Sequence, residues 1–147
     1  KSYFCNTMGQ ILAIDFGHKR CGIAITDPMQ LIASGLTTVP THEVEDFLKA
    51  YVSKEKVAGF VVGKPYQMNF QDSESEQYIG SFLERLNHLF PQIAVTRVDE
   101  RFTSKMAKQS LIDSGAKKKV RKQKEVIDEI SATLILQTYL DQQKNTL

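Results

Sequence analysis

Acidic residues occur in three separated segments of the chain, each at an apolar run. Asp15 follows the run ILAI, Asp99 and Glu100 follow IAVTRV, and Asp128 lies in VIDEISATLILQTYL. A cluster of carboxylates repels itself unless a cation neutralises it. Oxygen ligands without a thiol or imidazole favour Mg²⁺ or Mn²⁺, and two such ions about 4 Å apart are the arrangement that cleaves phosphodiesters. If the three segments meet, their chemistry is metal-dependent phosphodiester hydrolysis.

Cations stand close to these acids. Lys19 and Arg20 come shortly after Asp15, Arg101 follows Glu100, and the run KKKVRKQK ends four residues before Asp128. That run holds no acid, and its cations are Lys117, Lys118, Lys119, Arg121, Lys122 and Lys124. A charge run is most often a solvated loop, but beside an acidic site it favours a surface that binds phosphate. No group of residues for reading base edges is evident, which favours recognition of nucleic-acid structure over sequence.

Each acid also has an ordinary structural explanation. An aspartate at a strand end is usually a turn or capping residue, and Glu100 can simply pair with Arg97 or Arg101. Asp128 in the first turn of a helix would be favoured by the helix dipole alone. Taken together with the basic run just before Asp128, the three acidic segments favour a functional site. Spacing alone does not show that the segments meet.

The apolar pattern predicts a mixed α/β domain with element order βββαβαβαα. Continuous apolar runs such as VAGFVVG are typical of strands buried on both faces. The expected strands are 11–14, 21–26, 31–39, 57–63 and 93–98, and the expected helices are 41–54, 75–90, 103–111 and 125–142. The first three strands form an antiparallel meander around a turn in which Gly17 is free to take positive φ. The later strands, reached through helices, lie parallel in the same sheet.

The direction of side chains along a strand limits which of the acids can face one another. Successive residues of a strand point to opposite faces, so only one of Asp99 and Glu100 can face Asp15. In the final helix, Ser131 and Ala132 are small enough to let the helix lie close against the sheet.

Length, composition and cysteine content indicate the number of domains and the class of protein. A chain of 147 residues, 41% hydrophobic and 24% charged with a net charge of +2, indicates one soluble domain over residues 8–142, with 1–7 as an N-terminal extension. Its apolar runs are too short to span a membrane and no signal peptide is visible, so we expect a cytoplasmic protein. Cys21, inside an apolar run, is expected to be a reduced, packed thiol. No Cys/His cluster has zinc spacing.

Four motifs, DFGHKRCGIAITDP, VVGKP, VDERFTS and IDEISATLILQTYLD, resemble in content and order the YqgF (RuvX) family of Holliday junction resolvases. The resemblance runs from about Met8 to Asp141 and implies an RNase H-like fold. It also implies a metal-binding acid triad of Asp15, Glu100 and Asp128, with Asp99 a weaker candidate, holding Mg²⁺ or Mn²⁺, expected as two ions. His18 departs from the family pattern, where Thr or Ser is usual, and Asn69 replaces a usual Asp, which bears on substrate preference more than on chemistry.

The resemblance implies a nuclease for structured nucleic acid. Its substrate would be Holliday junction DNA, the 5′ end of pre-16S rRNA during ribosome biogenesis, or both, and its partners would include a ribosomal particle or a second copy in a homodimer. Residues expected to bind substrate phosphate are Lys19, Arg20, Arg101, Lys117, Lys118, Lys119, Arg121 and Lys122. The alternative is a non-catalytic RNA-binding assembly factor with the same fold. A kinase is excluded because no glycine-rich loop or HRD accompanies DFG, and an actin-like ATPase would need a second domain.

Overall fold

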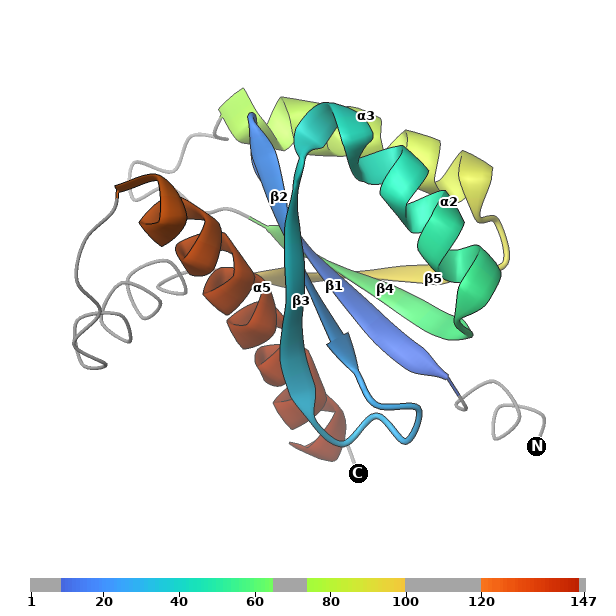
Figure 1. The fold of residues 1–147 in the computed structure, drawn as a ribbon. Helices are drawn as coiled ribbons and strands as arrows, with labels where there is room; N and C mark the ends of the chain where they lie inside the picture. Colours follow the sequence, from blue (N-terminus) through green and yellow to red (C-terminus); the bar gives the residue numbers. More distant parts are fainter. Residues whose placement is uncertain (1–8, 65–73, 100–119, 146–147) are drawn as a thin grey trace.

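A computed structural model describes residues 9–64, 74–99 and 120–145, and these form one sheet with helices on both faces (Figure 1). The strands are β1 (Gln10–Phe16), β2 (Arg20–Thr26), β3 (Ala33–Pro40), β4 (Val57–Lys64) and β5 (Ala94–Asp99). The helices are the short 3₁₀ helix η1 (Thr41–Glu43), α2 (Val44–Lys54), α3 (Glu74–Leu89) and α5 (Val120–Asn145). The predicted helix over 103–111 and the extension over 1–7 lie outside the described residues.

The sheet has the strand order β3-β2-β1-β4-β5. β1 pairs antiparallel with β2 and β2 antiparallel with β3, whereas β4 runs parallel to β1 and β5 parallel to β4. The predicted meander followed by parallel strands is thereby confirmed, and the architecture is consistent with an RNase H-like fold.

Two apolar layers cover the two faces of the sheet. On one face, Leu12, Ile14 and Phe16 of β1 pack with α2 and α3. On the other, Ile11 and Ala13 pack with Ala132, Ile135 and Leu136 of α5 (Figure 1). Because consecutive residues of β1 supply different layers, the sequence of this strand is apolar throughout rather than alternating. The free thiol of Cys21 is buried in the α2/α3 layer, as expected.

The β2–β3 connection is longer than predicted, because β3 begins at Ala33 rather than at residue 31. Asp27 holds this connection: its carboxylate accepts hydrogen bonds from the backbone N–H groups of Met29, Leu31 and Ile32, at 3.0, 2.8 and 2.8 Å. The N–H groups of Leu31 and Ile32 therefore bond to a side chain and not to a neighbouring strand. For this reason the strand does not begin at these residues, although their apolar pattern predicted it.

The final helix begins earlier than predicted. α5 starts at Val120, so residues 120–124 of the basic run are helical and not the loop that the charge pattern indicated. This segment contains no glycine or proline, and Lys, Arg and Gln are good helix formers. No described helix is long and apolar enough to cross a bilayer.

Candidate active site

Asp15 lies near the end of β1 on the face covered by α5. It follows Ala13 at the strand period of two, and Ala13 belongs to the α5 layer. Its antiparallel partner in β2 is Gly22, and directly paired residues share a face of the sheet. Asp15 is partly buried and has a polar partner in the structure. The first predicted acid is therefore on the side of the sheet that receives the last helix.

Gly22 is the point where α5 rests on the sheet. A β-carbon at this position would overlap the backbone carbonyl of Asp128 and would lie 3.1 Å from the Asp128 β-carbon. Only glycine therefore permits this approach of helix to strand. The close packing predicted from Ser131 and Ala132 is confirmed, since both are buried. The contact sets the backbone of Asp128 directly against the residue paired with Asp15, which brings two of the predicted acids to one place.

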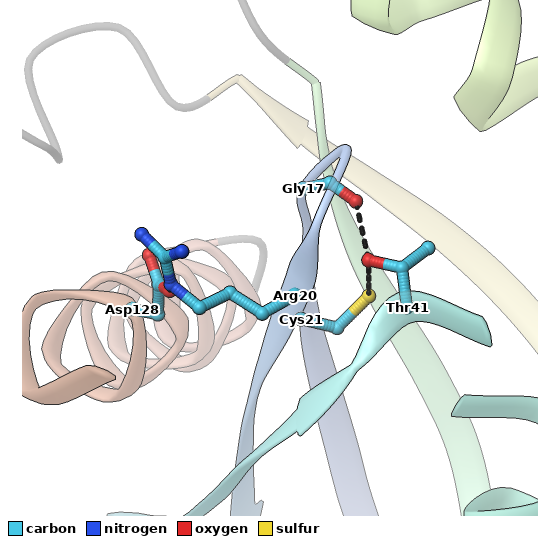
Figure 2. Close-up of polar contacts among 5 residues, drawn as sticks. All are labelled: Gly17, Arg20, Cys21, Thr41 and Asp128. Atoms are coloured by element: carbon cyan, nitrogen blue, oxygen red, sulfur yellow. Dashed lines mark hydrogen bonds and ion pairs between the residues drawn. The ribbon is translucent and has the colours of Figure 1, made fainter. Parts of the chain in front are cut away.

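Arg20 connects the same two elements through its side chain. Its Nε donates to Oδ2 of Asp128 at 2.6 Å, with 33% and 21% of the two side chains exposed (Figure 2). A charge-assisted bond of this length fixes the direction of the carboxylate. Arg20 was predicted to bind phosphate, and in this structure it pairs with the predicted metal ligand.

Thr41 supports the β1–β2 turn from the other side. Its hydroxyl donates to the carbonyl of Gly17 at 2.7 Å and lies 3.6 Å from the sulfur of Cys21 (Figure 2), and its backbone N–H donates to the carbonyl of Lys19 at 3.0 Å. Gly17 does not have the positive φ that was expected. It is needed for another reason: a β-carbon there would overlap the carbonyl of Arg20.

The charges of Asp15 and Asp128 both affect the pKa of Cys21, which follows the β1–β2 turn. The pKa of the Cys21 thiol is raised, chiefly by burial and further by the negative charges of Asp15 and Asp128, while hydrogen bonds with Thr41 and Gly17 oppose the rise. Both carboxylates thus act on one thiol at the start of β2. The raised pKa keeps Cys21 a neutral packing group rather than a nucleophile.

An open hollow of about 290 Å³ borders these groups. Its lining residues are Gly17, His18, Lys19, Arg20 and Asp128. Lys19 is exposed and Arg20 half-buried, so the hollow presents two cations beside a carboxylate. Such a surface can receive a phosphate group beside the acidic residues.

Comparison with known proteins decides the family. The family model described as "RuvX: Holliday junction resolvase" matches residues 9–142. The chain belongs to the RuvX family. Proteins named "Putative pre-16S rRNA nuclease" are 57% identical in Flavobacterium johnsoniae, over 93% of this chain and 99% of the relative, and 54% identical in Porphyromonas gingivalis, over 91% and 97%. A third, from Christiangramia forsetii, is 54% identical over 90% of this chain and 98% of its own.

The structure describes only one of the two candidates for the third predicted acid. Asp99 comes directly after Val98, which packs in the α5 layer, so Asp99 points to the opposite face from Asp15. Glu100, the stronger candidate, lies outside the described residues. Within the part of the chain that is described, no group of three or more acidic, histidine or cysteine side chains is arranged to hold a metal ion.

The structure places only two of the remaining phosphate-binding candidates. Lys117, Lys118, Lys119 and Arg101 lie outside the described residues. Arg121 and Lys122 belong to the first turn of α5.

The ordinary explanation of Asp128 is weakened by where α5 begins. Asp128 is eight residues after Val120, in the third turn of the helix, and the first turn holds no acid. The favourable interaction with the helix dipole is confined to that first turn. The helix dipole therefore does not account for a carboxylate here, whereas the ion pair with Arg20 on β2 gives it a partner outside the helix.

Two residues of the candidate site were missed from the sequence. Gly22 interrupts the apolar strand CGIAIT, and a glycine within a strand is a known signal of close backbone approach. Thr41 was taken only as part of a helix. Its hydrogen bonds to the turn depend on β3 lying beside β2, which no local pattern reveals.

Proposed function

We propose that this protein is a Mg²⁺- or Mn²⁺-dependent endonuclease that hydrolyses phosphodiester bonds in structured nucleic acid. A nuclease, and so a hydrolase, is what the family and its named relatives support. The observation that carries the proposal is the contact of α5 with Gly22, which sets Asp128 beside the strand position paired with Asp15.

The donor set fits a hard divalent cation. Asp15, Asp128 and, by family pattern, Glu100 would hold it through carboxylate oxygens. Asp128 already has a cationic partner in Arg20 at 2.6 Å, which is consistent with a carboxylate held where positive charge is needed. The bound ions would lower the pKa of a water molecule and stabilise negative charge on the oxygen that leaves.

The protein's own groups would position the substrate. Lys19 and Arg20 bind the phosphates on either side of the cleaved bond, and the basic run before Asp128 extends this contact along the backbone. Thr41 holds the turn that carries both cations. Water attacks phosphorus, the bond from phosphorus to the leaving oxygen breaks, and that oxygen takes up a proton, with no covalent link to the protein.

Two substrates follow from the relatives and the family. The named relatives support a pre-16S rRNA substrate, and the family description supports a four-way DNA junction. For the RNA, the proposed site of action is its 5′ end within a ribosomal particle. A junction with two symmetric strands would require a homodimer, whereas a single RNA end would not. The alternative function is an RNA-binding assembly factor that does not cleave.

The test is a cleavage assay on a four-way junction, single-stranded DNA and an rRNA precursor in parallel, with Mg²⁺, Mn²⁺ or EDTA. We expect metal-dependent cleavage of at least one substrate, and its loss in Asp15→Asn while nucleic-acid binding persists or tightens. Binding of rRNA precursor without cleavage of any substrate in either metal would overturn the nuclease proposal in favour of the assembly factor.

A further inference from the structure

A second hollow lies on the opposite side of the β1–β2 turn from the acids. Its volume is about 200 Å³. Its lining residues are Phe16, His18, Thr41, Tyr78, Ser81 and Arg85. His18 lines both this hollow and the one that contains Arg20 and Asp128. The turn therefore separates a charged hollow from an aromatic one, and a single exposed side chain belongs to both.

Two aromatic rings form the exposed rim of the second hollow. The imidazole of His18 and the ring of Tyr78 lie with centroids 4.9 Å apart, tilted by 58°. Tyr78 is 50% exposed and His18 is exposed. Tyr and His each combine an aromatic ring with a polar tip, so an exposed pair of them beside a hollow offers an aromatic surface to a ligand.

Packed and hydrogen-bonded side chains form the base of this hollow. Phe16, 7% exposed, stacks on the buried Phe82 with centroids 4.5 Å apart and planes at 25°. Arg85 is tied to Glu45 through an Nε–Oε2 contact of 2.7 Å. Thr41 holds the turn through its bond to Gly17. The two exposed rings therefore stand on a fixed support, which lowers the entropic cost of stacking a ligand on them.

We infer that His18 and Tyr78 form a stacking site for one unpaired nucleobase of the substrate. Every base presents a π-face to aromatic rings, and such stacking is independent of sequence. Lys19 and Arg20, next to His18 in the chain, would hold the phosphates of the same strand. The inference rests on the proposed function, because it takes nucleic acid as the ligand, and it adds that the substrate carries an unpaired nucleotide beside the cleaved bond.

Binding measured in EDTA separates this inference from the proposed catalysis. The probe is a short single-stranded oligonucleotide with 2-aminopurine, whose fluorescence falls when the base stacks. We expect the wild-type protein to quench the fluorescence. Tyr78→Ala and His18→Ala should each bind with a dissociation constant at least about fivefold higher and should lose much of the quenching. Tyr78→Phe retains the ring and should bind as the wild type does. His88→Ala, an exposed histidine near the end of the same helix, is the matched control.

A second oligonucleotide, abasic throughout, distinguishes base stacking from backbone binding. The wild-type protein and Tyr78→Ala should bind it equally, because both retain the phosphate contacts. Equal affinity of wild type and Tyr78→Ala for the 2-aminopurine strand, or an equal loss on the abasic strand, would overturn the inference. Circular dichroism confirms that each variant is folded. Stacking without cleavage of any substrate would contradict the proposed nuclease and support the stacking site. Cleavage without stacking would support the nuclease and contradict the stacking site.

Discussion

Nε of Arg20 and Oδ2 of Asp128 lie 2.6 Å apart although the two residues are separated by 108 positions in the chain. The bond joins the first residue of β2 to the third turn of α5 (Figure 2). It links a predicted phosphate-binding cation to a predicted metal ligand, next to the strand that carries Asp15. Several consequences of this arrangement can be measured.

Arg20 and a divalent cation should compete for Asp128. Replacing Arg20 by Gln removes a positive charge from the carboxylate and frees Oδ2, so we expect Mn²⁺ to bind several times more tightly. Calorimetric titration of Mn²⁺ into the wild type and Arg20→Gln measures this. Lys49→Gln, which removes an exposed charge on α2, should leave the affinity unchanged. Weaker Mn²⁺ binding in Arg20→Gln would mean that the arginine orients the carboxylate for the metal rather than competing with it.

Gly22 should be intolerant of any side chain. A methyl group there would overlap the carbonyl of Asp128, so Gly22→Ala should lower the free energy of unfolding by about 1–3 kcal/mol. Urea unfolding followed by circular dichroism provides the value. Gly80→Ala is the matched control: nothing lies within 4 Å of a β-carbon at Gly80 in α3, so alanine should be neutral or stabilising by up to about 1 kcal/mol. A neutral Gly22→Ala would contradict the close approach of α5.

Lys19 should contribute one phosphate contact. Its side chain is exposed at the rim of the charged hollow, so Lys19→Gln should weaken binding to all nucleic-acid sequences alike. The slope of log affinity against log salt should become shallower by about 0.9 on duplex DNA. Fluorescence anisotropy at several salt concentrations gives both slopes, with Lys49→Gln as the control. An unchanged slope would remove Lys19 from the binding surface.

Much of the fold follows from sequence because its signals are local. Continuous apolar runs predicted β1 and β4, and helical periods predicted α2 and α3 within a few residues of their observed bounds. The start of α5 was predicted too late because a dense run of cations is typical of a loop, although lysine and arginine also favour helix. The β3 start was misplaced because Asp27, four to five residues away, bonds to the N–H groups of Leu31 and Ile32.

The site was harder to predict because it depends on contacts between distant segments. Residue types indicated that Asp15 and Asp128 could bind metal, but the packing of α5 on Gly22 is a tertiary contact without a local pattern. The pairing of His18 with Tyr78 likewise joins a turn to a helix sixty residues later. The expectation that the acids converge came from the resemblance to a family. It could not supply the aromatic pair, because His18 departs from the family pattern.

Asp27 should make the protein sensitive to acid. Backbone N–H groups, that of Ile32 foremost, lower the pKa of Asp27 below its usual value of 3.8. A carboxyl whose pKa is lower in the folded state stabilises the fold above its unfolded pKa, and this contribution is lost as pH falls through the folded value. The stability difference between wild type and Asp27→Asn should therefore be largest at neutral pH and shrink below about pH 4. Urea unfolding from pH 7 to pH 3 tests this. A difference independent of pH would contradict the role of the charge.

The most direct test of the proposed nuclease compares two aspartates of the same helix. Asp128 lies against Gly22 and pairs with Arg20, whereas Asp141 is exposed and accepts a bond from Gln137 at 3.0 Å. Cleavage of an rRNA precursor and a four-way junction is measured with Mn²⁺ for Asp128→Asn and Asp141→Asn. On the proposed role of Asp128 as a metal ligand, Asp128→Asn should cleave at least about 100-fold more slowly than the wild type, with Asp141→Asn close to wild type. Equal rates for Asp128→Asn and the wild type would contradict the site.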